Sequence, residues 1–281
     1  MDTLVRAHRR WITSGDAEPL VSVITPTYNG AATLPYACES VLAQTLVNFE
    51  LILIDDASTD ETSEVIAHYE ALDPRIRALR NSVNSRQAEV EWEPRNDGIG
   101  VARGSLVAYL DDDNTWDPRF LEHLATALMQ RPWVQLAYCR SRNFHDPLDI
   151  DPVIAGDSRT AVERGLDWVV FAQDEIRPEE LGSSQYVDTN EMMHRMSAFG
   201  PLGHRWRVFH PRRAWVNANQ GAGSPYRRHN DLDLVERFIE VFGPQAIIQI
   251  PEVLVNYYYP SARRARHPLA GAFGERARPF A

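Results

Sequence analysis

The chain of 281 residues contains no lysine, so all 29 of its basic residues are arginine. Schiff-base catalysis and a phosphate-binding P-loop are therefore excluded, because both need a lysine amine. Cysteine is scarce as well: Cys38 and Cys139 are too few for a disulfide framework, and no Cys/His spacing is typical of a zinc site. We expect both thiols to be reduced and the protein to be cytoplasmic.

Long hydrophobic runs are also missing. The longest, such as residues 51–54, have the length of a strand, whereas a membrane span needs roughly 18–20 apolar residues. Residues 1–10 are charged without an apolar segment after them, so no signal peptide is predicted. Positive charge is in the minority, with 39 acidic against 29 basic residues and a net charge of −10. This balance argues against a nucleic-acid partner and permits an acidic cleft that holds a divalent cation.

The first half of the chain alternates apolar strand patterns with helical patterns. The expected elements are strand 21–25, helix 33–44, strand 49–55, a helix opened by a capping box at 58–61, strand 76–80, strand 106–110, a helix from Asp117-Pro118 to about Gln130, and strand 134–139. Strands that alternate with helices predict an α/β fold with a mostly parallel central sheet flanked by helices.

After about residue 140 this alternation breaks, which predicts a smaller mixed region. The expected pieces are an amphipathic segment at 162–171, a strand near 186–188, a helix over 231–242, and strands at 246–250 and 253–259. The predicted organisation is an N-terminal arm (1–19), two halves of one domain (20–140 and 141–259), and a C-terminal tail (260–281). The tail carries five arginines against one glutamate. It is predicted to be a solvated terminus, with weak contact to an anionic membrane surface as the alternative.

The sharpest motif is Asp111-Asp112-Asp113-Asn114, directly after the predicted strand 106–110. Three adjacent carboxylates repel one another unless a cation neutralises them, and ligands of open parallel sheets bind where the strands end. Oxygen ligands suit Mg²⁺ or Mn²⁺, which would also bridge a diphosphate. The alternative is a solvated acidic turn in which one aspartate caps the next helix.

Two further polar segments follow the first two predicted strands. Pro26 fixes the backbone, and Tyr28 presents an aromatic face on which a planar base could stack. Asp56, after strand 49–55, could accept hydrogen bonds from a base or a ribose hydroxyl. The alternatives are a packed tyrosine in an ordinary turn and an aspartate that caps a helix. Because all these segments end strands of one parallel sheet, we expect them to share one edge of it.

A glycine-rich segment, Gly98-Ile99-Gly100 with Gly104, looks superficially like a dinucleotide-binding fingerprint. Arg103 occupies the place of the third glycine, and the segment follows the third strand instead of the first. We therefore predict a helix that packs close to the sheet.

The segment VSVITPTYNG…FELILIDDASTDET…RNDGIGVARGSLVAYLDDDN resembles the nucleotide-binding half of the family 2 glycosyltransferases, over about residues 20–140. The resemblance implies the GT-A fold, which is a Rossmann-like α/β fold. It also implies a metal-dependent, inverting, hexosyltransferase-like enzyme that uses a nucleoside-diphosphate sugar and Mn²⁺ or Mg²⁺.

The same resemblance implies roles for individual residues. Tyr28 would stack on the nucleobase and Asp56 would bind the base. An arginine would contact the diphosphate, with Arg86 as the best match and Arg95 as the runner-up. In the Asp-x-Asp motif Asp113 would bind the metal, while Asp111 or Asp112 would reach the ribose or the metal.

The second half of the chain matches this family less densely. At the start of the predicted helix 231–242 the family carries an acidic residue, usually within Glu-Asp, that takes the proton from the acceptor hydroxyl. Asn230 replaces the first acid here, which leaves Asp231 as the base and Asp233 as the fallback. A helix N-terminus stabilises a carboxylate. The alternative is that Asp231 only caps the helix.

The acceptor side is predicted from residue type and from the segment Thr189–Arg195, which loosely resembles the family's acceptor-side segment. Histidines in this region are candidates for a metal or phosphate contact and tryptophans for stacking on a sugar face, with ordinary packing as the alternative. They are His194, His204, His210, His229, Trp206 and Trp215. His204, Trp206 and His229 are our acceptor-site candidates. The acceptor itself is left open between a glycan, a lipid-linked sugar, a peptide and a small molecule.

The predicted function is transfer of a sugar from a nucleoside-diphosphate sugar to an acceptor hydroxyl. A non-catalytic protein that binds sugar nucleotides or glycans is one alternative, against which the intact Asp111–Asp113 run argues. A sugar-phosphate nucleotidyltransferase is the other. That family's glycine-rich loop and basic pair have no counterpart here, because the first strand leads into Pro26-Thr27-Tyr28-Asn29 and lysine is absent.

Overall fold

The structure is a computed structural model that describes residues 18–85, 93–145, 169–172, 187–203 and 230–258. Nearly all of the predicted N-terminal arm and the whole basic tail lie outside these ranges. The division into two halves at residue 140 stays a prediction.

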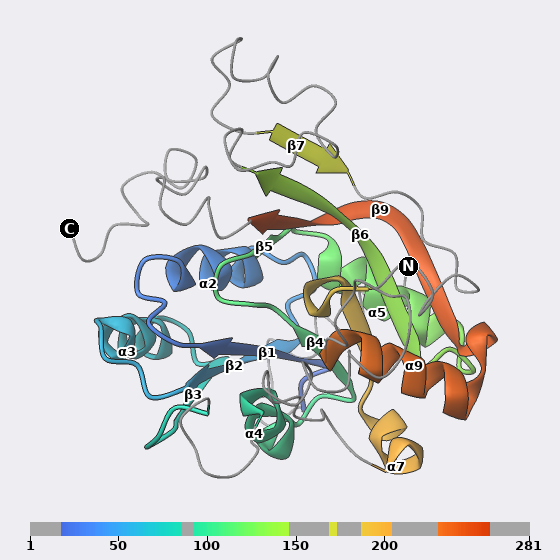
Figure 1. Cartoon of the computed structure of the whole chain (residues 1–281), viewed down its shortest axis with the longest axis horizontal. Coiled ribbons are helices and arrows are strands. Elements are labelled where there is room, and N and C mark those ends of the chain that lie inside the picture. The colour runs from blue at the N-terminus through green and yellow to red at the C-terminus, as the bar shows by residue number, and fades with distance from the viewer. Residues whose placement is uncertain (1–17, 86–92, 146–168, 173–186, 204–229, 259–281) are drawn as a thin grey trace, which may run out of the picture.

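The first half of the chain builds the parallel part of the sheet (Figure 1). Four strands run parallel in the order β3-β2-β1-β4. They are β1 (Val21–Thr27), β2 (Phe49–Asp55), β3 (Ile76–Arg80) and β4 (Leu106–Tyr109). Their apolar and β-branched residues give strands that both faces of a sheet can bury. The four strands predicted from the sequence are therefore confirmed.

The sheet then continues with strands of mixed direction. In spatial order, β8 (Met192–Arg195) lies antiparallel between β4 and β6 (Leu136–His145), and β9 (Ile247–Tyr258) runs parallel to β6. Two short strands complete it: β5 (Thr115–Trp116) pairs with β9, and β7 (Val169–Ala172) pairs with β6. The predicted α/β class with a mixed second region is confirmed.

Helices cover both faces of this sheet. The α-helices are α2 (Leu34–Leu42), α3 (Thr62–Leu72), α4 (Pro94–Val101), α5 (Phe120–Gln130), α7 (Phe199–Leu202) and α9 (Asn230–Phe242). Short 3₁₀ turns are η2 (Thr189–Glu191), η3 (Met196–Ala198) and η4 (Pro244–Ala246). The glycine-rich segment forms α4 as predicted. A Cβ on Gly98 would lie 2.7 Å from Ile24 Cγ2, so only glycine lets the helix approach the strand this closely.

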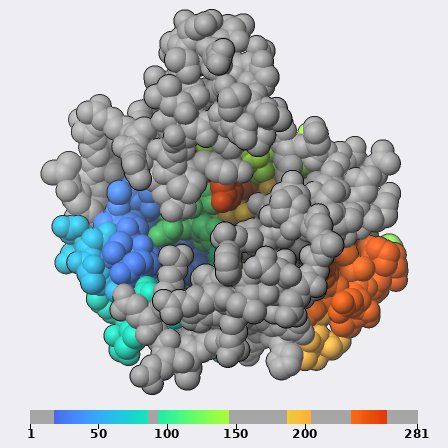
Figure 2. All heavy atoms as spheres, viewed as in Figure 1, coloured from blue at the N-terminus to red at the C-terminus, as the bar shows by residue number. Residues whose placement is uncertain are grey.

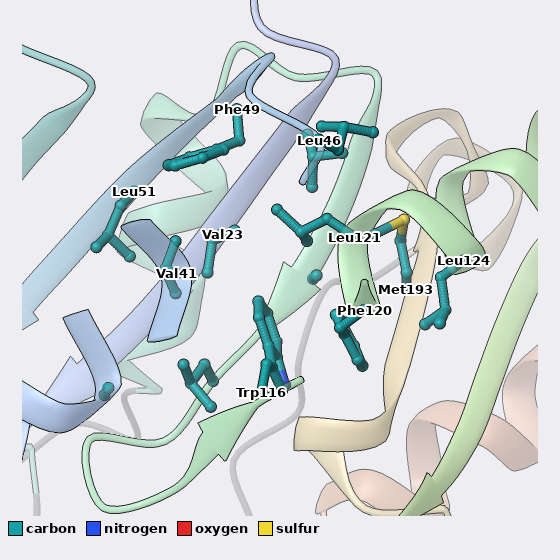
Figure 3. Close-up of a cluster of buried hydrophobic side chains, with 14 of the residues drawn as sticks. Val23, Val41, Leu46, Phe49, Leu51, Trp116, Phe120, Leu121, Leu124 and Met193 are labelled. Atoms are coloured by element: carbon teal, nitrogen blue, oxygen red, sulfur yellow. The ribbon is translucent and has the colours of Figure 1, made fainter. Parts of the chain in front are cut away.

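The alternation of side chains along the strands creates two apolar layers. Leu51 and Leu53 of β2 face the cluster beneath α2, α3 and α5, whereas Ile52 and Ile54 face the cluster beneath α4, α7 and α9. Figure 3 shows the first cluster, where Trp116 stacks on Phe120 with ring centroids 4.0 Å apart. These layers hold the strand ends that carry the candidate site.

Two helices begin later than predicted. Ser58 does not cap a helix, because its hydroxyl accepts from Asn29 N (2.9 Å), and α3 starts at Thr62. Asp117 accepts from Arg119 N (3.0 Å) within a turn, and α5 starts at Phe120. In both places a side chain that resembles a helix cap stabilises a loop instead.

Two strand predictions also need correction. The strand expected near 186–188 lies at β8 instead, because Asp188 caps the 3₁₀ turn η2 before the chain extends. The strands expected at 246–250 and 253–259 form the single strand β9, with an irregular register against β6 between Tyr138 and Ser141.

Candidate active site

The carboxyl ends of β1, β2 and β4 meet at one edge of the sheet. Thr27, the last residue of β1, lies in register with Asp55, the last of β2. Two backbone hydrogen bonds continue this alignment beyond the strands: Asp56 N donates to Thr27 O (2.9 Å), and Leu110 N donates to Ile24 O (3.1 Å). Because the strands are parallel neighbours, the three predicted segments share this edge.

Tyr28 occupies an exposed position on that edge. The residue is 42% exposed, although it follows a buried strand. The next residue, Asn29, has a φ of 53° and is fastened to the loop after β2, because its Oδ1 accepts from Thr59 N (2.8 Å). A fixed backbone that carries an exposed aromatic ring is suited to stacking on a planar ligand. Pro26 lies within β1, paired with Ile54.

Asp56 is buried and engaged by the loop that follows β3. Its carboxylate accepts from the side-chain amides of Asn81 (3.1 Å) and Asn84 (3.0 Å) and from the Ser85 hydroxyl (2.7 Å). Ser85 N donates to both of its oxygens as well. Asp56 therefore fixes the loop 81–85, and its predicted contact with a base stays a prediction.

The Asp111–Asn114 motif forms a tight turn directly after β4, closed by Asn114 N donating to Asp111 O (3.2 Å). Asn114 Oδ1 accepts from Tyr258 N of β9 (2.9 Å). Seen as spheres, green atoms from the middle of the chain lie near blue atoms of the N-terminal part and red atoms of the C-terminal part of the described chain (Figure 2). The turn thus joins the beginning, middle and end of the described chain.

Asp112 connects the turn to β1. Its Oδ2 accepts from Thr27 Oγ1 at 2.5 Å, which places two predicted segments in direct contact. A Cβ on Gly30 would lie 2.2 Å from this Oδ2 atom, so glycine is required at position 30 for the aspartate to approach. Asp113, the next residue, is buried.

Arg95 lies close to the Asp-rich turn, as expected of an arginine that would contact a diphosphate bound there. Its guanidinium forms ion pairs with Glu93 (3.0 Å), which caps α4, and with Asp111 (2.7 Å). Arg95 therefore contacts the Asp-rich turn in this structure, and its predicted diphosphate contact stays a prediction.

Two residues that the sequence analysis did not assign to the donor site, Asp188 and Asn190, complete it. Asp188 Oδ1 accepts from Asn190 N (2.9 Å), and Asn190 Nδ2 donates to Asp111 Oδ2 (3.0 Å). Burial, and then the charge of Asp111, raise the pKa of Asp188 to about 6. The signal that could have found them is the Asp-x-x-Glu capping box before an apolar run, at Asp188-Thr189-Asn190-Glu191.

The catalytic-base prediction falls on the first turn of α9. The helix begins at Asn230, one residue before the predicted start, so Asp231 is its second residue, and the side chain of Asp231 lies outside the described part. The fallback residue, Asp233, is buried and accepts from Arg237 Nε (2.8 Å). Arg86, His204, Trp206 and His229 lie outside the described residues. His194 is buried and accepts from or donates to the Tyr109 hydroxyl (2.8 Å), so it belongs to the core.

The donor chemistry of the turn fits a divalent cation whose coordination a substrate completes. Within the described ranges, no group of three or more His, Cys, Asp or Glu side chains is arranged to hold a metal. Mg²⁺ is commonly bound by one or two carboxylates together with substrate phosphates and water, without a cage made only of protein ligands. The oxygens of the Asp112-Asp113 pair meet that requirement.

The comparisons with known proteins agree with this geometry. A profile of Glycosyl transferase family 2 matches residues 22–198. The chain belongs to glycosyl transferase family 2. A putative teichuronic acid biosynthesis glycosyltransferase, TuaG of Bacillus subtilis, is 39% identical over 114 residues, which is 41% of this chain and 44% of that protein. The chain covers less than half the length of this and other curated relatives.

Solved structures place this family 2 chain among proteins of similar fold. Staphylococcus aureus TarS has a TM-score of 0.57 at 15% identity, over 85% of this chain and 36% of that chain. The mannosyltransferase PcManGT of Pyrobaculum calidifontis, solved with GDP-Man and Mn²⁺, has a TM-score of 0.53 at 18% identity, over 95% and 69%. The predicted GT-A fold is confirmed. None of the described helices combines the length and the hydropathy that crossing a bilayer requires.

Proposed function

We propose that this family 2 protein transfers a sugar from a nucleoside-diphosphate sugar to an acceptor hydroxyl, with inversion at the anomeric carbon and with Mn²⁺ or Mg²⁺. The observation that carries the proposal is the contact of Thr27 with Asp112. It brings the exposed ring of Tyr28 and the Asp-rich turn to one sheet edge. An aromatic face and a carboxylate turn suit the two ends of a nucleoside diphosphate.

The names of similar proteins support this class of donor. TarS has been solved with UDP-GlcNAc, PcManGT with GDP-Man and Mn²⁺, and a relative in Escherichia coli, WfgD, is named as a UDP-Glc-dependent glucosyltransferase. WfgD is 37% identical over 103 residues, which is 37% of this chain and 38% of that protein. Because these nucleotide sugars differ in base and in sugar, we propose a nucleoside-diphosphate sugar as the class of donor and leave its base and sugar open.

Each side chain of the proposed donor site has its own role. Tyr28 stacks on the base. Asp113, with Asp112 beside it, holds the divalent cation, which supplies neutralisation of the diphosphate's negative charge when it is bound. Both oxygens of Asp111 already accept bonds from Arg95 and Asn190, so we assign Asp111 to fixing the turn, in place of metal ligation.

Asp231 acts as the general base. It removes the proton from the acceptor hydroxyl while that oxygen attacks the anomeric carbon from the side opposite the diphosphate. The bond between the anomeric carbon and the diphosphate oxygen breaks as the new bond forms, and the diphosphate leaves with the electron pair. One displacement of this kind inverts the anomeric configuration.

Two variants and one control test the proposal. Nucleotide binding is measured by calorimetry with UDP and GDP, each with and without Mn²⁺. Turnover is measured as nucleoside diphosphate released from a panel of sugar nucleotides, with water as acceptor. We expect Asp231→Asn to lose about 10²–10⁴-fold in turnover while it keeps nucleotide binding. Asp113→Asn should lose the Mn²⁺-dependent part of binding.

Glu240→Gln is the control, because Glu240 is an exposed carboxylate on the same helix as Asp231. It should match the wild type in both measurements. Wild-type protein that binds neither nucleotide more tightly with Mn²⁺ than without it would overturn the proposed function. Near-normal turnover by Asp231→Asn would overturn the base assignment alone.

A further inference from the structure

Asn190 lies fully buried behind the Asp-rich turn, with an exposure of 0%. Its side chain contacts Asp111 at two points: Oδ1 accepts from Asp111 N (2.6 Å), and Nδ2 donates to Asp111 Oδ2 (3.0 Å). The same Nδ2 donates to Asp188 Oδ1 (2.5 Å), and the backbone carbonyl of Asn190 accepts from Trp116 Nε1 (2.8 Å). A two-point contact fixes both the backbone and the side chain of Asp111.

Only an amide satisfies this environment. The backbone N–H of Asp111 needs an acceptor, whereas the carboxylates of Asp111 and Asp188 need a donor, and an asparagine side chain supplies both. An aspartate at position 190 would place a third carboxylate against these two. An apolar residue would leave buried polar groups without a partner, which is costly in the interior.

Three residues of the turn are held by four different elements. Asn190 of η2 and Arg95 of α4 fix Asp111, Thr27 of β1 fixes Asp112, and the backbone of Tyr258 in β9 fixes Asn114. Asp113 lies between the second and third of these residues. We propose that Asn190 is a positioning residue for the donor site, and that by fixing Asp111 it sets where the oxygens of Asp112 and Asp113 lie. This inference rests on the proposed function, because it assumes that the turn binds a nucleoside diphosphate with a cation.

The test compares Asn190→Ala with Asn48→Ala. Asn48 is the matched control, because its Oδ1 accepts from Leu20 N at the opposite edge of the sheet. The measurement is the Mn²⁺ concentration that half-saturates binding of UDP or GDP, whichever raises the melting temperature of the wild type. We expect the half-saturating Mn²⁺ concentration of Asn190→Ala to be at least about 10-fold higher than that of the wild type. Losses of this size are usual when a residue that orients a metal-binding carboxylate is removed. Asn48→Ala should keep the wild-type requirement.

A merely structural role predicts a different result, in which the melting temperature of Asn190→Ala falls and its requirement for Mn²⁺ stays at the wild-type value. That result overturns the inference while it leaves the proposed function standing. If the wild type binds neither nucleotide, the proposed function fails and this inference fails with it.

A second measurement needs no ligand. Asn190→Ala, Asp111→Ala and the double variant form a cycle of melting temperatures. If the two side chains act through one contact, the double variant should lose less than the sum of the two single losses, by about 2 °C or more. Additive losses would show that Asn190 does not act through Asp111, and would overturn the inference even if Asn190→Ala had weakened binding.

Discussion

The two ends of the parallel strands both bury carboxylates, but they treat them differently. At the amino-terminal end, Glu50 accepts from the Ser22 hydroxyl (2.7 Å), from Arg103 N (2.7 Å) and Nε (3.1 Å), and from Arg77 Nη2 (2.7 Å). Burial alone would raise the pKa of Glu50, but the bonds from Arg103 and Ser22 and the charge of Arg77 hold it below its ordinary value. Two arginines therefore more than balance one carboxylate.

The carboxyl-terminal end relies more on uncharged donors, as far as the described residues show. Arg95 pairs with Asp111 and Arg80 lies 3.6 Å from Asp55, whereas Asp56, Asp112 and Asp188 accept bonds from asparagine, serine, threonine and backbone groups. Neutral donors satisfy hydrogen bonds without cancelling charge. The difference teaches that a carboxylate whose pKa is held low by arginines contributes to stability at neutral pH, whereas carboxylates held by neutral donors keep a charge that a bound cation can complement.

The largest expected effect is a loss of stability when Glu50, at the amino-terminal end of the strands, is replaced. Glu50→Leu removes the buried acceptor of the Ser22 hydroxyl and of Arg103 N–H, whereas Arg77 and Arg103 are partly exposed and can turn to water, so we expect a loss of about 3 kcal/mol in the free energy of unfolding. Urea denaturation measures it. If the two ends of the strands act independently, the folded fraction of this variant should bind nucleotide as tightly as the wild type does. A change in the Mn²⁺ requirement of this variant would mean that the two ends are not separable.

The next largest effect is a loss of turnover when the carboxyl-terminal end of the strands is disturbed at Gly30. Gly30→Ala forces its Cβ against Asp112 Oδ2 and Thr27 Oγ1, which must separate. We expect turnover to fall about 100-fold, because displacing a reactive group by about 1 Å has this cost. Gly200→Ala is the control, because a Cβ there meets no atom within 4 Å. Equal turnover by the two variants would contradict the role given to the Thr27–Asp112 contact.

A smaller effect is a change in pH dependence. Since the pKa of Asp188 is about 6 in the folded protein against an ordinary 3.8, its contribution to stability is present below pH 3.8 and is lost as pH rises through 6. Asp188→Asn removes this loss, so its stability relative to the wild type should rise between about pH 4 and pH 7. Thermal unfolding across that range measures the difference, and a flat difference curve would refute the raised pKa.

The smallest effect concerns the backbone beside Asp56. Ala57 has a φ of 63°, a left-handed conformation that glycine adopts without steric cost. Ala57→Gly should therefore raise the free energy of unfolding by less than about 1 kcal/mol, since the relieved strain is partly offset by the flexibility of glycine when unfolded. Calorimetric unfolding measures it. A clear destabilisation would mean that the alanine methyl group packs usefully at this edge.

Sequence patterns correctly predicted those elements that depend mainly on residues close together in the chain. The parallel strands follow from apolar runs such as Phe49–Asp55, and the shared edge follows from their direction. The starts of α3 and α5 were misplaced because Ser58 and Asp117 bond to nearby loops, which a single sequence does not distinguish from helix caps. The strand Met192–Arg195 was misplaced for a different reason: its partners, β4 and β6, lie more than 45 residues earlier in the sequence.

The candidate site also contains residues that the sequence could predict and residues that it could not. Tyr28, Asp56 and Asp111–Asp113 follow directly from strands, so their positions could be predicted. Asn190 and Asp188 could not, because the contact of Asn190 with Asp111 spans 79 residues and depends on how the second half of the chain folds back. Their own short motif predicts a capped turn and says nothing about which strand end it approaches.

The bond from Tyr258 N to Asn114 Oδ1, together with the pairing of β5 with β9, has a consequence for synthesis. A ribosome that has released only the first 200 residues has already made all three adjacent aspartates, yet the segment that tethers Asn114 is still to be translated. The nascent protein therefore has the residues that hold Asp111 and Asp112, namely Thr27, Arg95 and Asn190, before it has the strand whose backbone fixes Asn114.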